Sequence, residues 1–202
     1  MLGSTARSSS VVRVDAGGIA SRPAIVILEP DALGDYNCMS ASQIADRQNM
    51  LTNAITQLNA QAPNTWTYLD AGNPGWVSAS TMAQRLHAAG LKGAHGFSVN
   101  VSNYYSTADN TTYGNAVNAE LKTRYGYTKP FVIDTSRNGK GTTDWCNPGG
   151  QKIGTTSRTS TGAEMLLWIK TPGESDGNCG VGGGSTAGEF LPEVAYKMIY
   201  GY

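Results

Sequence analysis

The sequence predicts an α/β fold in which strands and helices alternate along a parallel sheet or barrel. Short continuous apolar runs indicate buried strands, because both faces of a parallel sheet are covered. Segments with apolar residues at helical spacing lie between these runs. Acidic and amide residues follow the runs, at the end of the strands where parallel folds place their active sites.

Five apolar runs are predicted to be strands. They are continuous rather than alternating, as expected for strands that are covered on both faces. The runs are AIVIL (24–28), WTYL (66–69), GFSV (96–99), FVI (131–133) and MLLWI (165–169).

Four segments are predicted to be helices, and together with the strands they give a βα series. In residues 40–61, Ser40 is the predicted N-cap, and five apolar residues recur at helical spacing. Residues 78–90 end at Gly90, a helix C-cap residue type. The others are residues 112–126 and residues 189–202, the last with Pro192 in its first turn.

Composition excludes some classes of partner. The 202 residues carry 15 basic and 15 acidic side chains, and no basic cluster occurs, which argues against a nucleic-acid partner. No apolar run approaches the ~20 residues that a membrane span needs, so no membrane association is expected. Residues 1–14 contain no apolar core of a secretory signal.

Polar residues follow each predicted strand. Because parallel strands point the same way, these side chains are expected to meet at one edge. A single Asp after a strand is often only a turn or capping residue, but equivalent positions after several strands favour chemistry. The residues are Asp31, Asp70, Asn100 and Asp134, with KTPGESD (170–176) after the last strand.

The residue types at this edge favour carboxylate catalysis. His87 lies within a predicted helix and His95 precedes a strand, so neither a metal site nor a Ser–His–Asp triad is predicted. Gly141 follows Lys140 where a phosphate loop requires Ser or Thr. The remaining candidate is acid/base catalysis of the kind that glycoside hydrolases use, which needs neither a metal nor a cofactor.

Two tryptophans support a sugar ligand. Trp76 and Trp145 lie in polar loops with Gly and Pro, just past strand ends. A loop tryptophan can simply fill a gap, but two beside an acidic edge favour stacking on sugar rings.

Six motifs resemble glycoside hydrolase family 6, the inverting cellulases. They occur in order from about residue 18 to the C-terminus. The resemblance implies a distorted parallel (β/α) barrel with one strand fewer than the usual eight, a monomer, an extracellular location, and cellulose or soluble β-1,4-glucan as substrate. The motifs are VILEPDAL, YLDAGNPGW, GFSVNVSNY, VIDTSRNG, DWCNPGG and LLWIKTPGESDG.

The resemblance assigns roles to individual residues. Asp31 matches the family's general acid, Asp70 a carboxylate that stabilises positive charge on the sugar, and Asp176 the proposed base. Asn73 stands where many members have histidine. The implied substrate-binding residues are Asn73, Trp76, Asn100, Asn103, Trp145, Lys170 and Glu174.

The cysteines and the N-terminal residues bear on how much of the catalytic domain this sequence contains. Three cysteines leave one unpaired, and the resemblance implies a Cys146–Cys179 disulfide, with the partner of Cys38 preceding the start of this sequence. About two strands that the family places before RPAIVILEPD are not recognised, so an N-terminally truncated barrel with about five recognisable strands is expected. Residues 1–17 would be an unmatched segment and residues 18–202 a partial catalytic domain.

Three functional interpretations remain open. The first is inverting hydrolysis of β-1,4-glucosidic bonds at internal positions of the glucan. Internal cleavage is expected because the short segment between GESDG and the last helix favours an open cleft. The alternative is a catalytically weak or inactive fragment that only binds glucan. An unrelated acid-rimmed barrel with another sugar substrate is a third reading.

Overall fold

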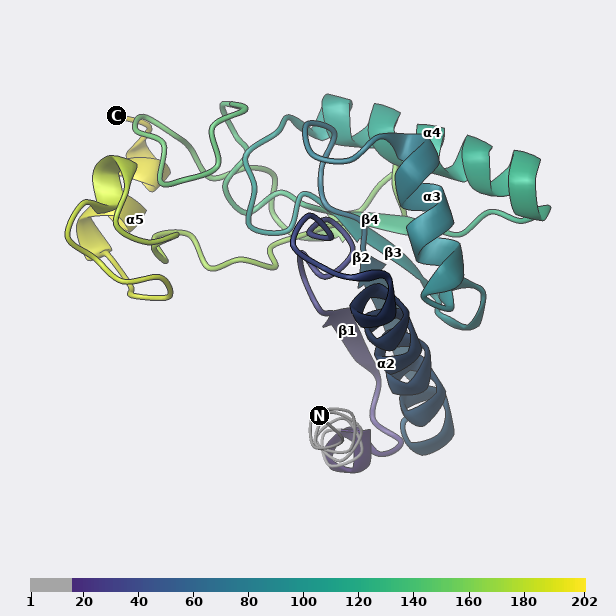
Figure 1. The fold of residues 1–202 in the computed structure, drawn as a ribbon. Helices are drawn as coiled ribbons and strands as arrows, with labels where there is room; N and C mark the ends of the chain where they lie inside the picture. Colours follow the sequence, from purple (N-terminus) through teal and green to yellow (C-terminus); the bar gives the residue numbers. More distant parts are fainter. Residues whose placement is uncertain (1–15) are drawn as a thin grey trace. The chain divides into compact units, whose positions relative to one another are not determined.

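The computed structural model (Figure 1) describes residues 16–202. These residues form two compact α/β units. The first unit runs to Gly72 and includes Val77–Ser98 and Ala116–Pro130. The second comprises Asn73–Trp76, Val99–Asn115 and Phe131–Tyr202. The predicted unmatched segment 1–17 lies outside the described residues except for its last two positions.

Three parallel strands form the sheet of the first unit. They are β1 (Ala24–Leu28), β2 (Thr65–Asp70) and β3 (Gly96–Val99), with β2 in the middle. Ile27 pairs with Tyr68, and Leu69 pairs with Phe97. These strands confirm the first three predicted runs and their parallel arrangement.

Two helices of the first unit pack beside this sheet (Figure 1). Helix α2 (Ala41–Gln61) begins with a capping box, in which Ser40 and Gln43 each bind the other's backbone N–H through the side chain. Helix α3 (Ala79–Ala88) is followed by Gly90, whose φ of +86° favours glycine. A short 3₁₀ turn, η1 (Leu91–Gly93), then leads into β3. The buried face of α2 consists of Leu51, Ala54, Ile55 and Leu58.

The second unit contains the other three strands. Strand β4 (Phe131–Asp134) pairs in parallel with β6 (Met165–Leu167), and the two-residue β5 (Arg158–Thr159) pairs antiparallel with β6. Strand β6 ends two residues earlier than predicted, because the next backbone N–H groups bind side chains: Trp168 donates to Ser157 Oγ, and Ile169 to the Asp134 carboxylate. Strand β5, exposed at both residues, was not predicted.

The two remaining helices differ from prediction mainly at their starts. Helix α4 (Thr107–Tyr125) begins five residues before the predicted start, because Ser106 Oγ accepts the N–H of Asp109 and caps the helix there. It belongs to the second unit up to Asn115 and to the first from Ala116. Helix α5 (Pro192–Tyr200) has Pro192 in its first turn, as predicted. The 3₁₀ turn η2 (Gly180–Gly182) precedes it.

Candidate active site

Asp31 lies in a turn directly after β1 that the chain holds in an unusual conformation. Glu29 and Asp31 adopt left-handed backbone angles, with φ of +50° and +70°, which side-chain-bearing residues rarely do. The turn is held from outside: Arg47 donates to the carbonyls of Ala32 and Asp35 at 2.8 and 2.9 Å. Strained backbone that neighbours over-determine is typical of functional sites.

Asp70, the last residue of β2, lies against this turn and is only 2% exposed. Its Oδ2 accepts the backbone N–H of Asp31 at 3.0 Å and that of Gly72 at 3.1 Å. Its Oδ1 accepts the hydroxyl of Ser98, in β3, at 3.3 Å. The predicted proximity of Asp31 and Asp70 is therefore confirmed, and Asp70 contacts the main chain of Asp31.

Both carboxyl groups hold their protons more tightly than usual. Burial raises the pKa of Asp70 to about 7, although its hydrogen-bond donors oppose the shift. The pKa of Asp31 is also raised, first by partial burial of the carboxyl group and then by the negative charge of Asp35. Asp31 still has exposed surface, and it lines a hollow of about 380 Å³ together with Glu29, Asp35, Arg47 and Met50.

Asp70→Asn is expected to flatten the pH dependence of stability. Because the pKa of Asp70 in the folded chain lies above its ordinary value of 3.8, this group stabilises the fold below pH 4, and the contribution is lost as the pH rises through about 7. The free energy of unfolding of the wild type should therefore fall relative to Asp70→Asn between pH 4 and 7, by at most about 4 kcal/mol.

Urea denaturation at several pH values measures this difference. Asp46→Asn, at an exposed position on α2 of the same unit, is the matched control and should follow the wild type. A constant difference between Asp70→Asn and the wild type across pH 4–7 would contradict the raised pKa.

Asp176, in the second unit, is an almost fully paired carboxylate. Arg137, 1% exposed, donates to Oδ2 and Oδ1 at 3.0 and 2.9 Å. Oδ2 also accepts the hydroxyl of Tyr104 at 3.2 Å and the backbone N–H of Asn147 at 3.1 Å. A carboxylate offers about four acceptor positions, so little capacity is left, and it lies on Oδ1.

Tyr104 and Arg137 pack against each other, and both donate hydrogen bonds to Asp176. The guanidinium carbon of Arg137 lies 4.3 Å from the centre of the Tyr104 ring, a cation–π geometry. Burial raises the pKa of Tyr104 well above its usual value, although the nearby Arg137 charge opposes the shift. The phenol therefore stays protonated and donates to Asp176.

Asp134 serves as an anchor of the backbone in the second unit. Its fully buried carboxylate accepts four backbone N–H groups, which follow β3, β4 and β6. With four donors and no exposed surface, the side chain fixes these segments to one another. The donors are Ser136 at 2.9 Å and Ile169 at 3.3 Å on Oδ1, and Ser102 and Lys170, both at 3.1 Å, on Oδ2.

The predicted amide residues mainly shape turns. Asn100 is fully buried, and its nitrogen lies within hydrogen-bond distance of the carbonyls of Asn103, Tyr105 and Asp134, so it anchors the turn after β3. Asn73 is buried, and its Oδ1 accepts the N–H of Gly75 at 3.0 Å in the turn that presents Trp76. These positions indicate structural work for Asn100 and Asn73, while their contact with substrate stays a prediction.

The remaining predicted substrate-binding residues are accessible. The side chains of Trp76 and Trp145 are exposed, the latter at 63%. Lys170 Nζ and Glu174 Oε1 form an ion pair at 2.6 Å, and Asn103 is partly exposed. All seven predicted substrate-binding residues and Asp176 belong to the second unit, whereas Asp31 and Asp70 belong to the first.

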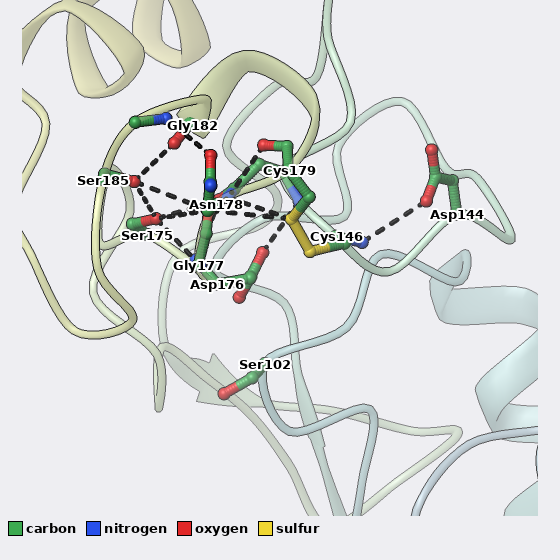
Figure 2. The surroundings of a disulfide bond; sticks show 12 residues. Ser102, Asp144, Cys146, Ser175, Asp176, Gly177, Asn178, Cys179, Gly182 and Ser185 are labelled. Carbon is green, nitrogen blue, oxygen red and sulfur yellow. Dashed lines mark hydrogen bonds between the residues drawn. A yellow bond between two sulfur atoms is a disulfide. The ribbon is translucent and has the colours of Figure 1, made fainter.

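The disulfide prediction is confirmed. Cys146 and Cys179 are bonded, with Cα atoms 5.9 Å apart, and Asp176 lies beside the bond (Figure 2). Within the described part of the chain, Cys38 is a free, exposed thiol. Residues 16–202 contain no group of three or more His, Cys, Asp or Glu side chains that could hold a metal ion. None of the helices described combines the length and apolarity needed to cross a bilayer.

Comparison with known proteins decides the family. The family model "Glycosyl hydrolases family 6" matches residues 10–200. The chain belongs to this family. It is 74% identical to Endoglucanase 1 of Streptomyces halstedii over 93% of this chain and 59% of that protein. It is 42% identical to Endoglucanase A of Cellulomonas fimi, over 91% of this chain and 39% of that protein.

A solved family 6 structure has the same fold. The endoglucanase Cel6 of Mycobacterium tuberculosis, in complex with methyl-cellobiosyl-4-deoxy-4-thio-β-D-cellobioside, aligns with a TM-score of 0.90 and 37% identity. The alignment covers 98% of this chain and 68% of that one. The α/β fold of the family 6 type, predicted from the βα pattern and the motifs, is therefore confirmed. The chain spans 59% or less of the length of the two endoglucanases above.

Sequence reasoning did not identify Arg137, Tyr104 or Asn147, the three residues that hold Asp176. All three lie within quoted motifs: Tyr104 in GFSVNVSNY, Arg137 in VIDTSRNG and Asn147 in DWCNPGG. The available signal was an Arg just past an apolar strand, a position that requires a buried anionic partner whenever the side chain turns inward.

Proposed function

We propose that this family 6 protein hydrolyses β-1,4-glucosidic bonds of cellulose or soluble β-1,4-glucan. It does so with inversion of configuration and at internal bonds of the glucan. The names of its relatives support the substrate class, since two of the most similar proteins are endoglucanases. The observation that carries the proposal is the pair Asp31 and Asp70, two carboxyl groups with raised pKa values at adjacent strand ends.

Asp31 is the general acid in this proposal. A general acid must be protonated when the glycosidic oxygen leaves, and a raised pKa keeps the proton in place at working pH. Burial and Asp35 both contribute to that shift. Asp70 binds the main chain of Asp31 and adds a carboxyl group whose pKa of about 7 lies close to neutral pH.

Asp176 matches the family's proposed base. Because three donors occupy Oδ2 and Arg137 occupies one position on Oδ1, only one acceptor position is left for a water molecule. We therefore assign to Asp176 the orientation of the attacking water rather than strong direct basicity. Trp76 and Trp145 provide exposed indole faces for sugar rings, and Lys170, Glu174 and Asn103 provide polar contacts.

An extracellular location and a monomeric state belong to the same proposal. The Cys146–Cys179 disulfide is typical of proteins that fold in oxidising compartments.

The test is the stereochemistry of the first products. ¹H NMR of cellopentaose hydrolysis should show the α-anomer first, and the viscosity of carboxymethylcellulose should fall faster than reducing ends accumulate. Initial β-anomer would contradict inversion, and early release of cellobiose alone would contradict internal cleavage. Retention on cellulose with no turnover would instead support the glucan-binding alternative.

A further inference from the structure

We propose that Asn147 is a positioning residue that fixes Asp176 for the reaction; this rests on the proposed function. Asn147 is 4% exposed and adopts a left-handed backbone with φ of +44°. It follows Cys146 directly, in a loop outside any helix or strand. It belongs to the motif DWCNPGG, but the sequence assigns it no role of its own.

Asn147 and Asp176 hold each other by two reciprocal hydrogen bonds. The side-chain Oδ1 of Asn147 accepts the backbone N–H of Asp176 at 2.9 Å. The backbone N–H of Asn147 donates to Oδ2 of Asp176 at 3.1 Å. One bond holds the main chain of Asp176 and the other contacts its carboxylate, so Asn147 contributes both to where the residue lies and to how its side chain is turned.

The carboxamide also holds the chain after Asp176. Its nitrogen donates to the carbonyl of Gly177 at 2.8 Å. The backbone carbonyl of Asn147 accepts the N–H of Val181 at 2.9 Å. If the amide oxygen and nitrogen were exchanged, the nitrogen would face the N–H of Asp176 and the oxygen would face the carbonyl of Gly177. Neither pair could form a hydrogen bond, so the contacts define one orientation of the amide. The Cys146–Cys179 disulfide ties the same two segments covalently (Figure 2).

Two glycines make room for this contact. A Cβ at Gly180 would collide with the carbonyl oxygen of Asn147, and a Cβ at Gly182 with its carboxamide nitrogen. Space for Asn147 is therefore built into η2. A displacement of about 1 Å at a catalytic group can cost about 100-fold in rate, so loss of this hold should appear in kcat.

The test variant is Asn147→Gly. Glycine tolerates the left-handed backbone and keeps the backbone donor to Asp176, so only the carboxamide is removed. Hydrogen exchange of the Asp176 amide, followed by NMR, should accelerate at least about tenfold because that N–H loses its acceptor. Asn147→Asp, which keeps an oxygen for this N–H but loses the donor to the Gly177 carbonyl, is the second variant, and its Asp176 amide should exchange more slowly than in Asn147→Gly.

Kinetics then test whether the hold serves catalysis. Asn147→Gly should lower kcat by about 10- to 100-fold with KM changed less than about twofold, since the reacting groups are misplaced rather than the substrate contacts. In the Asp176→Asn background, where no carboxylate is left to position, the same substitution should change kcat less than about twofold. An equal loss in both backgrounds would overturn the proposal.

Asn64→Gly is the matched control. Asn64 also bonds a carbonyl through its side chain, that of Ser21 at 2.7 Å, but in the first unit and outside the candidate site. It should leave kcat and exchange at Asp176 unchanged. If the wild-type chain hydrolyses no glucan, the proposed function fails, while accelerated exchange in Asn147→Gly still supports the hold on Asp176; unchanged exchange overturns it.

Discussion

Asp31→Asn is expected to lower kcat on cellopentaose by about 100- to 10,000-fold, the contribution of a general acid. Asparagine keeps the size of the side chain and cannot protonate the leaving oxygen. The contact between this turn and Asp70 uses the backbone N–H of Asp31, so the substitution leaves it in place. The loss should therefore appear in kcat without a decrease in the free energy of unfolding, since the substitution removes a carboxyl group whose pKa is raised in the folded chain.

The leaving group separates acid catalysis from a general disturbance. An aryl cellobioside with a strongly acidic phenol needs no protonation, so Asp31→Asn should cleave it with a much smaller deficit. Asp35→Asn provides the neighbouring control: removing this charge lowers the pKa of Asp31, and the alkaline limb of the kcat/KM profile should move to lower pH. Equal deficits on both substrates would contradict the role of Asp31.

The strands were predictable because burial on both faces leaves a continuous apolar run. Strands β1 and β3 have the predicted bounds, and β2 differs by one residue at each end. The end of β6 was not predictable, since it depends on contacts with the side chains of Asp134 and Ser157, which lie 35 and 11 residues before the residues that bind them. The start of α4 was missed because its first turn is polar and is fixed by the hydroxyl of Ser106.

The candidate site, like the fold, was predictable from the sequence only in part. Motif positions at strand ends sufficed to predict that Asp31 and Asp70 lie together, because register carries neighbouring parallel strands to one edge. They could not reveal that Arg137, 39 residues before Asp176, occupies both of its oxygens. Pairing over such a separation depends on tertiary packing and leaves no periodic signal. For the same reason the role of Asn147 emerges only from its contacts.

Arg137→Met is expected to lower the free energy of unfolding by about 3–5 kcal/mol, the cost of removing one partner of a buried ion pair. Methionine fills much of the volume of the arginine stem but leaves Asp176 charged and without its bidentate donor. The stacking on Tyr104 is lost as well. Urea denaturation at neutral pH measures the change, and Arg124→Met, which breaks the exposed pair with Glu120, should leave stability nearly unchanged.

A double variant separates the lost pair from the lost packing. If the cost comes from an uncompensated charge, Arg137→Met combined with Asp176→Asn should be more stable than Arg137→Met alone, because no buried carboxylate remains while an amide oxygen can still accept from Tyr104 and Asn147. If it comes from packing around Tyr104, the second substitution should add a further loss. A small effect of Arg137→Met alone would mean that water reaches Asp176 freely, and the argument that its lone pairs are nearly exhausted would then fail with it.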